Sequence, residues 1–363
     1  MQSKCVGCGA ILQNKKENEA GFVPKLTEDM KICRRCFRIM HYNELPKIVA
    51  TNKEYEAVID SVVSKKALFV FIVDVFSFKS TFHPLMIDRL REKDVILLAN
   101  KMDLLPKSSN FSKVVEWISK ECERKNFNPL VIGIASAKQQ NYIDELISTI
   151  DLSRRGRDVY FVGCANVGKS SIINALLKRT TVQTKDSIAT SLVPGTTLNQ
   201  IRIPYFEDNQ ALIDTPGLIN PSDILNQLLP QSYRTIVPNA EIKPKTYQMT
   251  KGNSIFLGGL ACLSFSCKEM CSVIVYTSNS LYIHRCKTER VEELFQNQLG
   301  HLLVPPLIEE VDHLSYYVKT LDIQGKKCIW FSGFGFVQIY GNARIQIRSL
   351  KNSEVYITDA ILG

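Results

Sequence analysis

The sequence has no apolar run long enough to suggest a membrane span. No segment approaches the roughly 20 apolar residues that a spanning helix needs, and no apolar core follows a basic start at the amino terminus. A glycine-rich dinucleotide fingerprint is also missing. These absences count against a membrane protein, a secreted protein and a dinucleotide-dependent redox enzyme, so we expect a cytoplasmic protein with no membrane partner.

The sequence also lacks long blocks of one charge. Its 363 residues include 45 Lys and Arg against 36 Asp and Glu, a formal net charge of +9, but the basic and acidic residues are interspersed. The excess favours a polyanionic partner such as nucleic acid, and a mildly basic solvated surface explains it equally well. With 45% hydrophobic and 22% charged residues, the composition is that of a globular protein with room for two or three domains.

Two C-x-x-C pairs lie near the amino terminus. Cys5 and Cys8 form the first pair, and Cys33 and Cys36 form the second. Each pair can place two thiolates on one tight turn, and four thiolates complete a tetrahedral Zn²⁺ site with no open position. In the reducing compartment expected here, a structural zinc is favoured over a disulfide or a redox pair. We therefore predict a zinc-binding knuckle.

Cations and aromatic residues surround the second cysteine pair. They suit phosphate contact and base stacking in RNA, but they would equally balance the negative charge of four thiolates on one Zn²⁺. Both interpretations stay open for Lys31, Arg34, Arg35, Phe37, Arg38 and Tyr42.

A phosphate-binding loop is predicted in the middle of the chain. Residues 163–170 fit G-x-x-x-x-G-K-[ST], with a strand-like segment at 159–162 and a helix-like segment at 171–177. Backbone N–H groups at the helix start would bind the phosphates, Lys169 would reach the β and γ phosphates, and the Ser170 hydroxyl would bind Mg²⁺. The predicted phosphate-binding residues are Gly163, Asn166, Val167, Gly168, Lys169, Ser170 and Ser171.

Two downstream segments complete the predicted triphosphate site. An apolar run at 211–213 leads into Asp-Thr-Pro-Gly at 214–217, which would place a carboxylate near Mg²⁺ and a glycine N–H near the γ phosphate. The turn before it offers Thr197, or alternatively Thr196, as a further Mg²⁺ ligand beside Ser170 and Asp214. Catalysis would rest on positioning and charge, and the predicted catalytic residues are Asn166, Lys169, Ser170, Thr197, Asp214 and Gly217.

Guanine recognition is predicted from segments that precede this loop. Residues 100–103 fit N-K-x-D after the segment 94–99, which is apolar from Val95 onward. In GTPases of this kind the aspartate accepts hydrogen bonds from guanine N1 and N2 hydrogens that adenine does not offer, the asparagine helps to position the base, and the lysine stem covers its face. Residues 136–138 follow another strand-like run and resemble a Ser-Ala-Lys loop whose backbone N–H meets guanine O6. The predicted base-binding residues are Asn100, Lys101, Asp103, Ser136, Ala137 and Lys138. Asp74, after the apolar run 68–73, is interpreted as an exposed strand-end residue outside the site.

The order of these motifs differs from that of ordinary GTPases, which begin with the phosphate-binding loop. Here the base-reading segments come first, and the loop, the switch threonine and D-T-P-G follow. The order predicts an α/β fold with a circularly permuted P-loop GTPase domain, because moving the termini preserves a site built from strand ends. D-T-P-G then leads soon into a C-terminal region, to which loss of the γ phosphate could be transmitted.

Hydrolysis is expected to be slow. Leu218 and Ile219 follow D-T-P-G, where many GTPases have a glutamine that orients water. The missing contact must come from another group, an ion or a partner. An asparagine at the position of Asn166 accompanies a bound K⁺ ion in related GTPases; its alternative role is to cap a local turn.

The region after residue 222 is predicted to be β-rich or α+β. Alternating apolar segments at 254–257 and 272–276 indicate strands, residues 224–229 look helical, and residues 291–299 have helical spacing. The segment 326–331 favours a strand with a buried aromatic side chain over a stacking surface for RNA. Cys262, Cys267 and Cys271 are interpreted as small apolar packing residues.

Together these features resemble the YqeH family of circularly permuted GTPases over the whole chain. The specific anchors are the four cysteines, residues 37–44, the nucleotide motifs and Gly333–Val337. The resemblance implies a four-cysteine zinc finger at 1–50, the GTPase domain at 51–222 and an RNA- or protein-interaction domain at 223–363.

The same resemblance implies function. It implies GTP hydrolysis to GDP and phosphate with Mg²⁺, coupled to assembly of the small ribosomal subunit through rRNA or ribosomal proteins. The region after D-T-P-G is only slightly cationic, less so than is usual in the family. The alternative is therefore a nucleotide-regulated protein-binding switch that does not contact RNA. We expect a monomer.

Overall fold

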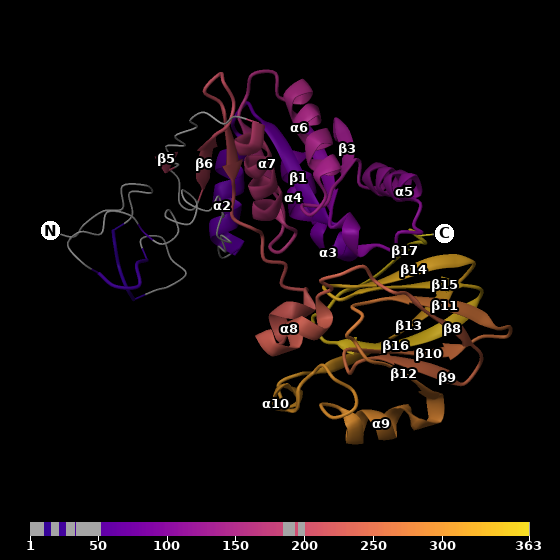
Figure 1. The fold of residues 1–363 in the computed structure, drawn as a ribbon. Helices are drawn as coiled ribbons and strands as arrows, with labels where there is room; N and C mark the ends of the chain where they lie inside the picture. The colour runs from indigo at the N-terminus through magenta and orange to yellow at the C-terminus, as the bar shows by residue number, and fades with distance from the viewer. Residues whose placement is uncertain are drawn as a thin grey trace. The chain divides into compact units, whose positions relative to one another are not determined.

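The computed structural model describes residues 11–15, 22–26, 33, 52–183, 193–194 and 200–362. These residues fall into two units (Figure 1). The first unit contains the described residues up to Asp74, together with those of Thr81–Met102 and Ile118–Ile219. The second takes Val75–Ser80, Asp103–Trp117 and the described residues from Asn220 onward. The domain boundaries predicted from the sequence stay a prediction.

A mostly parallel sheet forms the centre of the first unit. Among the described residues seven strands join it in the order β3-β2-β1-β4-β7-β6-β5. The pairs β2–β3, β1–β2, β1–β4 and β4–β7 are parallel, whereas β6–β7 and β5–β6 are antiparallel. The strands are β1 (Leu68–Asp74), β2 (Val95–Asn100), β3 (Val131–Ile134), β4 (Val159–Val162), β5 (Val193–Pro194), β6 (Ile201–Pro204) and β7 (Ala211–Asp214).

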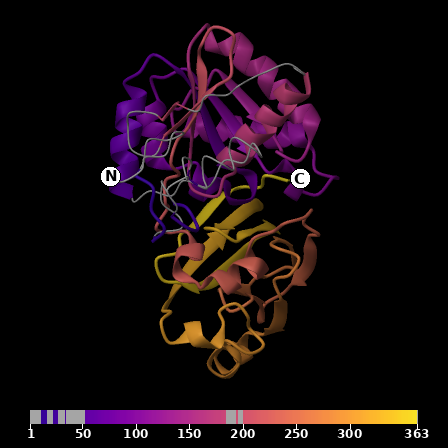
Figure 2. The same ribbon diagram turned by 60° about the vertical axis from the view of Figure 1, so that its left-hand side comes forward.

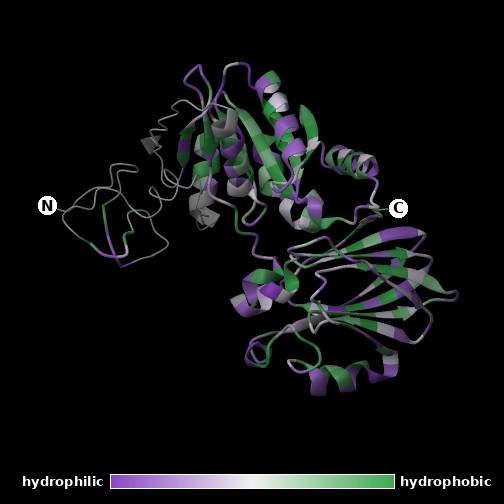
Figure 3. Cartoon of the chain, in the orientation of Figure 1, coloured by the Kyte–Doolittle hydropathy of each residue, from purple (hydrophilic) through white to green (hydrophobic). Residues whose placement is uncertain are grey.

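The central strands are apolar because both faces of the sheet are covered. Every residue of β1, β2, β4 and β7 is buried, as expected for parallel strands between helices, and Figure 3 shows these strands in green along most of their length. In Figure 2 the indigo and the magenta helices lie on opposite sides of the sheet. The helices are α2 (Asn52–Val63), α3 (Phe78–Thr81), α4 (Pro84–Leu90), α5 (Phe111–Arg124), α6 (Gln140–Arg154) and α7 (Lys169–Gln183), with 3₁₀ turns η1 (Val75–Ser77) and η2 (Met102–Leu104).

Local sequence signals set some of the helix ends. His83 caps α4, since its Nδ1 accepts a hydrogen bond from Leu85 N at 3.2 Å, and Pro84 occupies the first turn. α6 ends at Arg155, which has a left-handed φ of 48° and is followed by Gly156 at 69°. α5 contributes residues to both units.

Two antiparallel sheets share one core in the second unit. Their strand orders are β12-β9-β10-β16-β13 and β17-β14-β15-β11-β8. Buried side chains from both sheets, among them Leu263, Val273, Val337 and Ile345, belong to a single apolar cluster, so the unit is a β-sandwich. The strands are β8 (Lys245–Met249), β9 (Asn253–Leu257), β10 (Ala261–Ser266), β11 (Cys271–Tyr276), β12 (Ile283–Lys287), β13 (Tyr316–Ile323), β14 (Lys326–Phe331), β15 (Gly335–Tyr340), β16 (Ala343–Leu350) and β17 (Val355–Asp359).

Helical segments accompany the sandwich. The predicted helix at 291–299 is confirmed as α9 (Val291–Gln298), which packs Val291 and Leu294 against Phe256 and Cys262. The helix-like patch at 224–229 is a shorter 3₁₀ turn, η3 (Ile224–Gln227). The remaining segments are α8 (Pro230–Ile236), η4 (Thr288–Arg290) and α10 (Ile308–Val311). Within the described residues, none of the helices has the length and apolar character that crossing a membrane requires.

Aromatic side chains line one face of the β14–β15–β11 sheet. Trp330 lies 4.5 Å from Phe336 and 5.5 Å from Trp117 between ring centroids, and Phe336 stacks on Tyr276 at 4.7 Å. Trp330 is 1% exposed. The prediction of a strand with a buried aromatic residue at 326–331 is therefore confirmed. Buried positions also confirm the packing role of Cys262, Cys267 and Cys271.

Candidate nucleotide site

The loop between β4 and α7 requires two glycines. Gly163 has a φ of 146°, and a Cβ there would lie 2.4 Å from the Ile72 carbonyl oxygen. Gly168 has a φ of 96°, and a Cβ there would lie 2.3 Å from Asn100 Nδ2. Side chains at both positions would break the loop. The bare backbone at the start of α7 suits close approach by a phosphate.

Lys169 opens α7 with a buried ammonium group. Its residue is 7% exposed, and Nζ donates hydrogen bonds to the carbonyl oxygens of Gly163 at 3.0 Å and Cys164 at 2.9 Å. Burial lowers the pKa of Lys169 below its usual value, while the Asp214 carboxylate acts in the opposite direction. The cation thus lies within the loop where the motif predicts a phosphate contact.

Ser170, in the first turn of α7, meets Asp214 at the end of β7. β4 and β7 are parallel with Phe161 opposite Asp214, and Ser170 Oγ donates to Asp214 Oδ2 at 2.9 Å. Asp214 is 1% exposed. Hydroxyl and carboxylate oxygens are ligands that Mg²⁺ prefers, so these two residues fit the predicted Mg²⁺ site.

The D-T-P-G segment runs beside the phosphate-binding loop. Leu218 N donates to the Gly163 carbonyl at 3.2 Å, and the Leu218 carbonyl accepts from Ala165 N at 2.7 Å. A Cβ on Gly217 would lie 2.7 Å from Ala165 Cα and 3.0 Å from Lys169 Nζ. The segment is therefore close enough to the lysine for both to contact one γ phosphate.

The two predicted base-reading segments lie at adjacent strand ends. Asn100 ends β2, and its Nδ2 donates to the Val167 carbonyl at 2.8 Å, which ties this segment to the phosphate-binding loop. Met102 N donates to the Ala135 carbonyl at 3.0 Å, which ties it to the Ser-Ala-Lys segment. Asp103 follows in η2. The first unit thus joins the base-reading and phosphate-binding segments by direct hydrogen bonds.

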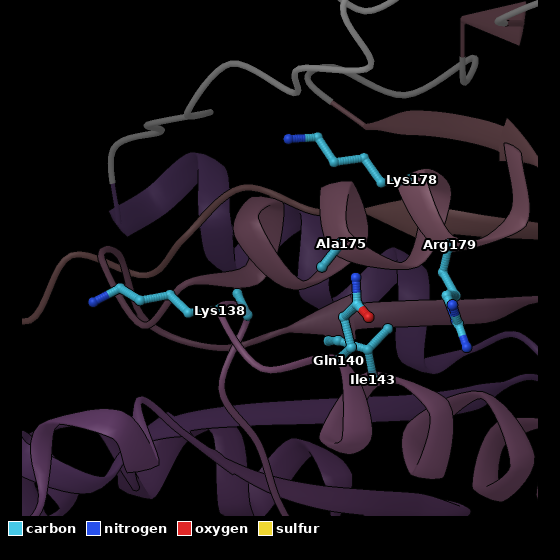
Figure 4. Close-up of a pocket in the computed structure, with 7 residues that line it drawn as sticks. Lys138, Gln140, Ile143, Ala175, Lys178 and Arg179 are labelled. Carbon is cyan, nitrogen blue, oxygen red and sulfur yellow. The ribbon is translucent and has the colours of Figure 1, made fainter. Parts of the chain in front are cut away.

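A cavity of about 260 Å³ opens beside the Ser-Ala-Lys segment (Figure 4). Arg179 in its wall holds Asp144 with two hydrogen bonds, at 2.6 and 3.0 Å. Of the residues that line the cavity, the sequence motifs predict only Ala137 and Lys138. The others come together only where α6 packs beside α7. The lining residues are Ala137, Lys138, Gln140, Ile143, Ala175, Lys178 and Arg179.

Several predicted ligands cannot be placed. Cys33 is described and buried, and among the residues whose positions the structure gives, no group of three or more His, Cys, Asp or Glu side chains could hold a metal ion. The zinc and switch-threonine assignments stay predictions, since Thr196, Thr197, Cys5, Cys8 and Cys36 lie outside the described residues.

The interpretation of Asp74 as an exposed strand-end residue is wrong. Asp74 is 6% exposed and lies opposite Asn100 in the parallel β1–β2 pair. Its Oδ2 accepts a hydrogen bond from Lys101 Nζ at 2.6 Å. The sequence does offer a signal for this position. Asp74 is an acidic residue directly after an apolar run, just as N-K-x-D directly follows the run at 95–99.

Comparison with known proteins defines the class. A family model described as "50S ribosome-binding GTPase" matches residues 158–244, which contain the phosphate-binding loop and D-T-P-G. GTPase Der of Buchnera aphidicola is 27% identical over 238 residues, which cover 59% of this chain and 49% of that protein. Fold, site and comparison agree that the chain contains a P-loop GTPase domain.

The family follows from the rest of the chain. A model described as "YqeH-like, C-terminal" matches residues 270–361. The protein YqeH of Bacillus subtilis is 33% identical over 363 residues, covering 99% of both chains. The chain belongs to the YqeH-like GTPase family. NO-associated protein 1 of Arabidopsis thaliana, named as chloroplastic/mitochondrial, is 31% identical over 84% of this chain and 62% of its own length.

Proposed function

We propose that the chain is a circularly permuted GTPase that acts as a molecular switch in assembly of the small ribosomal subunit. The observation that carries the proposal is the hydrogen-bonded assembly of Asn100, the phosphate-binding loop, Lys169 and Asp214, in a chain that is 33% identical to YqeH throughout. The motif order supports the permutation: the base-reading strand β2 precedes the loop after β4 in the chain, yet β1, β2 and β4 are neighbours in one sheet.

The residues suggest how the reaction would be promoted. Backbone N–H groups of the loop and the Lys169 ammonium would bind the phosphates and offset charge that develops during transfer. Ser170 and Asp214 would hold Mg²⁺, which neutralises phosphate charge when bound. The Gly217 backbone would contact the γ phosphate. Asn100, Lys101, Asp103, Ser136, Ala137 and Lys138 would bind guanine, with the Lys101 stem against the face of the base.

The proposed hydrolysis is slow without a further component. Leu218 is 2% exposed and apolar, so it offers no hydrogen bond to an attacking water. Asn166 has a left-handed φ of 63°, a conformation that asparagine tolerates well. That geometry fits a role for Asn166 in the local turn. In the proposed mechanism the same residue also lies beside a bound K⁺ ion.

The remaining assignments complete the proposal. Cys5, Cys8, Cys33 and Cys36 bind one structural Zn²⁺ in a domain at 1–50, the GTPase domain covers 51–222, and the domain at 223–363 contacts rRNA or ribosomal proteins. The protein is a cytoplasmic monomer. The second candidate is a switch that binds only proteins, which the slightly cationic C-terminal region favours.

The test is GTP hydrolysis by the purified chain in K⁺ and in Na⁺ buffer, alone and with isolated 30S or 50S subunits. We expect a slow rate that K⁺ raises and 30S subunits raise further, and one zinc ion per chain by metal analysis. Lys169→Ala is the inactive control, expected to lower the rate about 1000-fold.

The outcomes separate the candidates. Stimulation by 50S and not 30S subunits would move the site of action to the large subunit, which the family description "50S ribosome-binding GTPase" names. Stimulation by neither, with hydrolysis intact, would favour the protein-binding switch. Absence of GTP binding by the wild-type chain would overturn the proposal.

A further inference from the structure

Asp74 is a buried charge at the carboxyl edge of the central strand. It is 6% exposed, its backbone N–H donates to Thr81 Oγ1 at 3.0 Å, and its Oδ2 accepts from Lys101 Nζ at 2.6 Å. Burying a carboxylate is costly unless it is paired and hydrogen-bonded. None of the predicted nucleotide contacts uses Asp74, so the question is what its pair with Lys101 contributes.

The partner of Asp74 is the lysine of N-K-x-D, and the backbone around that lysine is constrained. Lys101 has a left-handed φ of 67°, a conformation that costs a non-glycine residue about 1 kcal/mol. Its two neighbours are fixed: Asn100 Nδ2 bonds to the Val167 carbonyl, and Met102 N bonds to the Ala135 carbonyl. With the backbone held, the direction of the flexible lysine stem is set by what holds its ammonium group.

Asp74 is well placed to hold it. The side chain of Lys101 is 26% exposed and that of Asp74 is 9% exposed, so the pair is partly shielded from water. Thr81, which fixes the backbone of Asp74, also accepts a hydrogen bond through its carbonyl from Cys164 Sγ at 3.6 Å, within the phosphate-binding loop. Thr81 therefore bonds both to the backbone of Asp74 and to the phosphate-binding loop.

We propose that Asp74 is a positioning residue for guanine recognition: its carboxylate holds the Lys101 ammonium group at the sheet edge, so that the methylene stem is ordered before the base binds. This inference rests on the proposed binding of guanine nucleotides at this site. Ordering a lysine stem in advance removes an entropy cost from binding. Asp74 acts through Lys101 and does not itself touch the nucleotide.

The test is a double-mutant cycle on the full chain. Affinities for GDP and KM and kcat for GTP are measured for wild type, Asp74→Asn, Lys101→Met and the double variant. We expect Asp74→Asn to weaken GDP binding about tenfold, the order expected for loss of one charge-assisted hydrogen bond, and to raise KM rather than lower kcat. In the Lys101→Met background the same change should have no further effect.

A matched control separates positioning from fold stability. Asp158 forms a similar pair in the same unit, with Arg202 Nη1 at 2.6 Å, and it also accepts from Ala211 N at 2.9 Å. It precedes β4, at the opposite end of the strand from the phosphate-binding loop. Asp158→Asn should leave the GDP affinity within twofold of wild type.

The proposal is overturned if Asp74→Asn binds GDP as wild type does, or if it weakens binding equally in both backgrounds. Should Asp74→Asn not fold, Lys101→Met and Lys101→Arg decide: both keep a long stem, but only arginine can still pair with Asp74, so equal affinities would refute positioning. If the wild-type chain binds no GDP, the proposed function fails, and that outcome is distinct from a failure of the Asp74 variants.

Discussion

Base choice in the proposed site depends on one carboxylate, Asp103. We expect Asp103→Asn to weaken GTP binding about 100-fold, because two charge-assisted hydrogen bonds to guanine N1 and N2 hydrogens are lost. The amide of asparagine can instead donate to the C2 carbonyl of xanthine. Competition binding with GTP and xanthosine triphosphate measures the change.

The control for this substitution is another acidic residue on the same chain. Asp88 is exposed and pairs with Arg91 at 2.9 Å on the surface, so Asp88→Asn should alter neither affinity. If Asp103→Asn bound GTP more weakly but did not bind xanthosine triphosphate more tightly, the Asp103 carboxylate would have a role other than reading the base edge.

Residues whose chemistry is local were predictable from the sequence, and residues whose role depends on a neighbour were not. Gly163, Gly168 and Lys169 could be predicted because the loop motif itself specifies them. It needs glycine where a Cβ would clash, and a lysine whose ammonium group lies within the loop. The exposure predicted for Asp74 is wrong, because its pairing with Lys101, which directly follows β2, cannot be read from the sequence around Asp74. Likewise, Arg179 lines a cavity that exists only where two helices pack.

At the scale of elements, apolar runs predicted the strands well, because strands buried on both faces need continuous apolar sequence. β1, β2, β4 and β7 lie within a residue or two of the predicted runs. The C-terminal region was predicted only as β-rich or α+β. Its division into two sheets depends on pairings between distant segments, such as β10 with β16, that no local pattern reveals.

The aromatic face of the second sheet is an element whose contribution to stability can be measured. Trp330 Nε1 donates to Thr358 Oγ1 at 2.9 Å, and the ring packs on Phe336. Trp330→Ala should lower the free energy of unfolding by about 3–5 kcal/mol, measured by urea denaturation followed by circular dichroism. Trp330→Phe keeps a ring and loses the hydrogen bond, so it should cost about 1 kcal/mol. Equal losses would show that the hydrogen bond, and not ring packing, dominates.

For the whole molecule, the path of the chain after D-T-P-G matters most. Leu218 bonds to the phosphate-binding loop. Six residues later Ile224 N donates to the Ser332 carbonyl of the sandwich at 3.1 Å, and Asp223 caps η3 through Leu225 N at 3.0 Å. Asn220 is already bonded within the second unit, since its Nδ2 donates to the Ser80 carbonyl at 3.0 Å. Few residues therefore separate the proposed γ-phosphate contact at Gly217 from fixed positions in the second unit, so we expect a movement at Gly217 to be transmitted along this segment.

Lengthening that connection should separate hydrolysis from its proposed output. We expect insertion of Gly-Ser-Gly between Ile219 and Asn220 to keep the slow basal rate, because the contacts of Leu218 precede the insertion, and to abolish stimulation by 30S subunits. The matched control inserts the same residues after Lys251, in the β8–β9 turn, where even a Cβ on Gly252 would meet nothing within 4 Å; there stimulation should persist. Full stimulation of both insertion variants would show that the subunit acts on the GTPase unit directly, because no signal would then need to pass along the short segment.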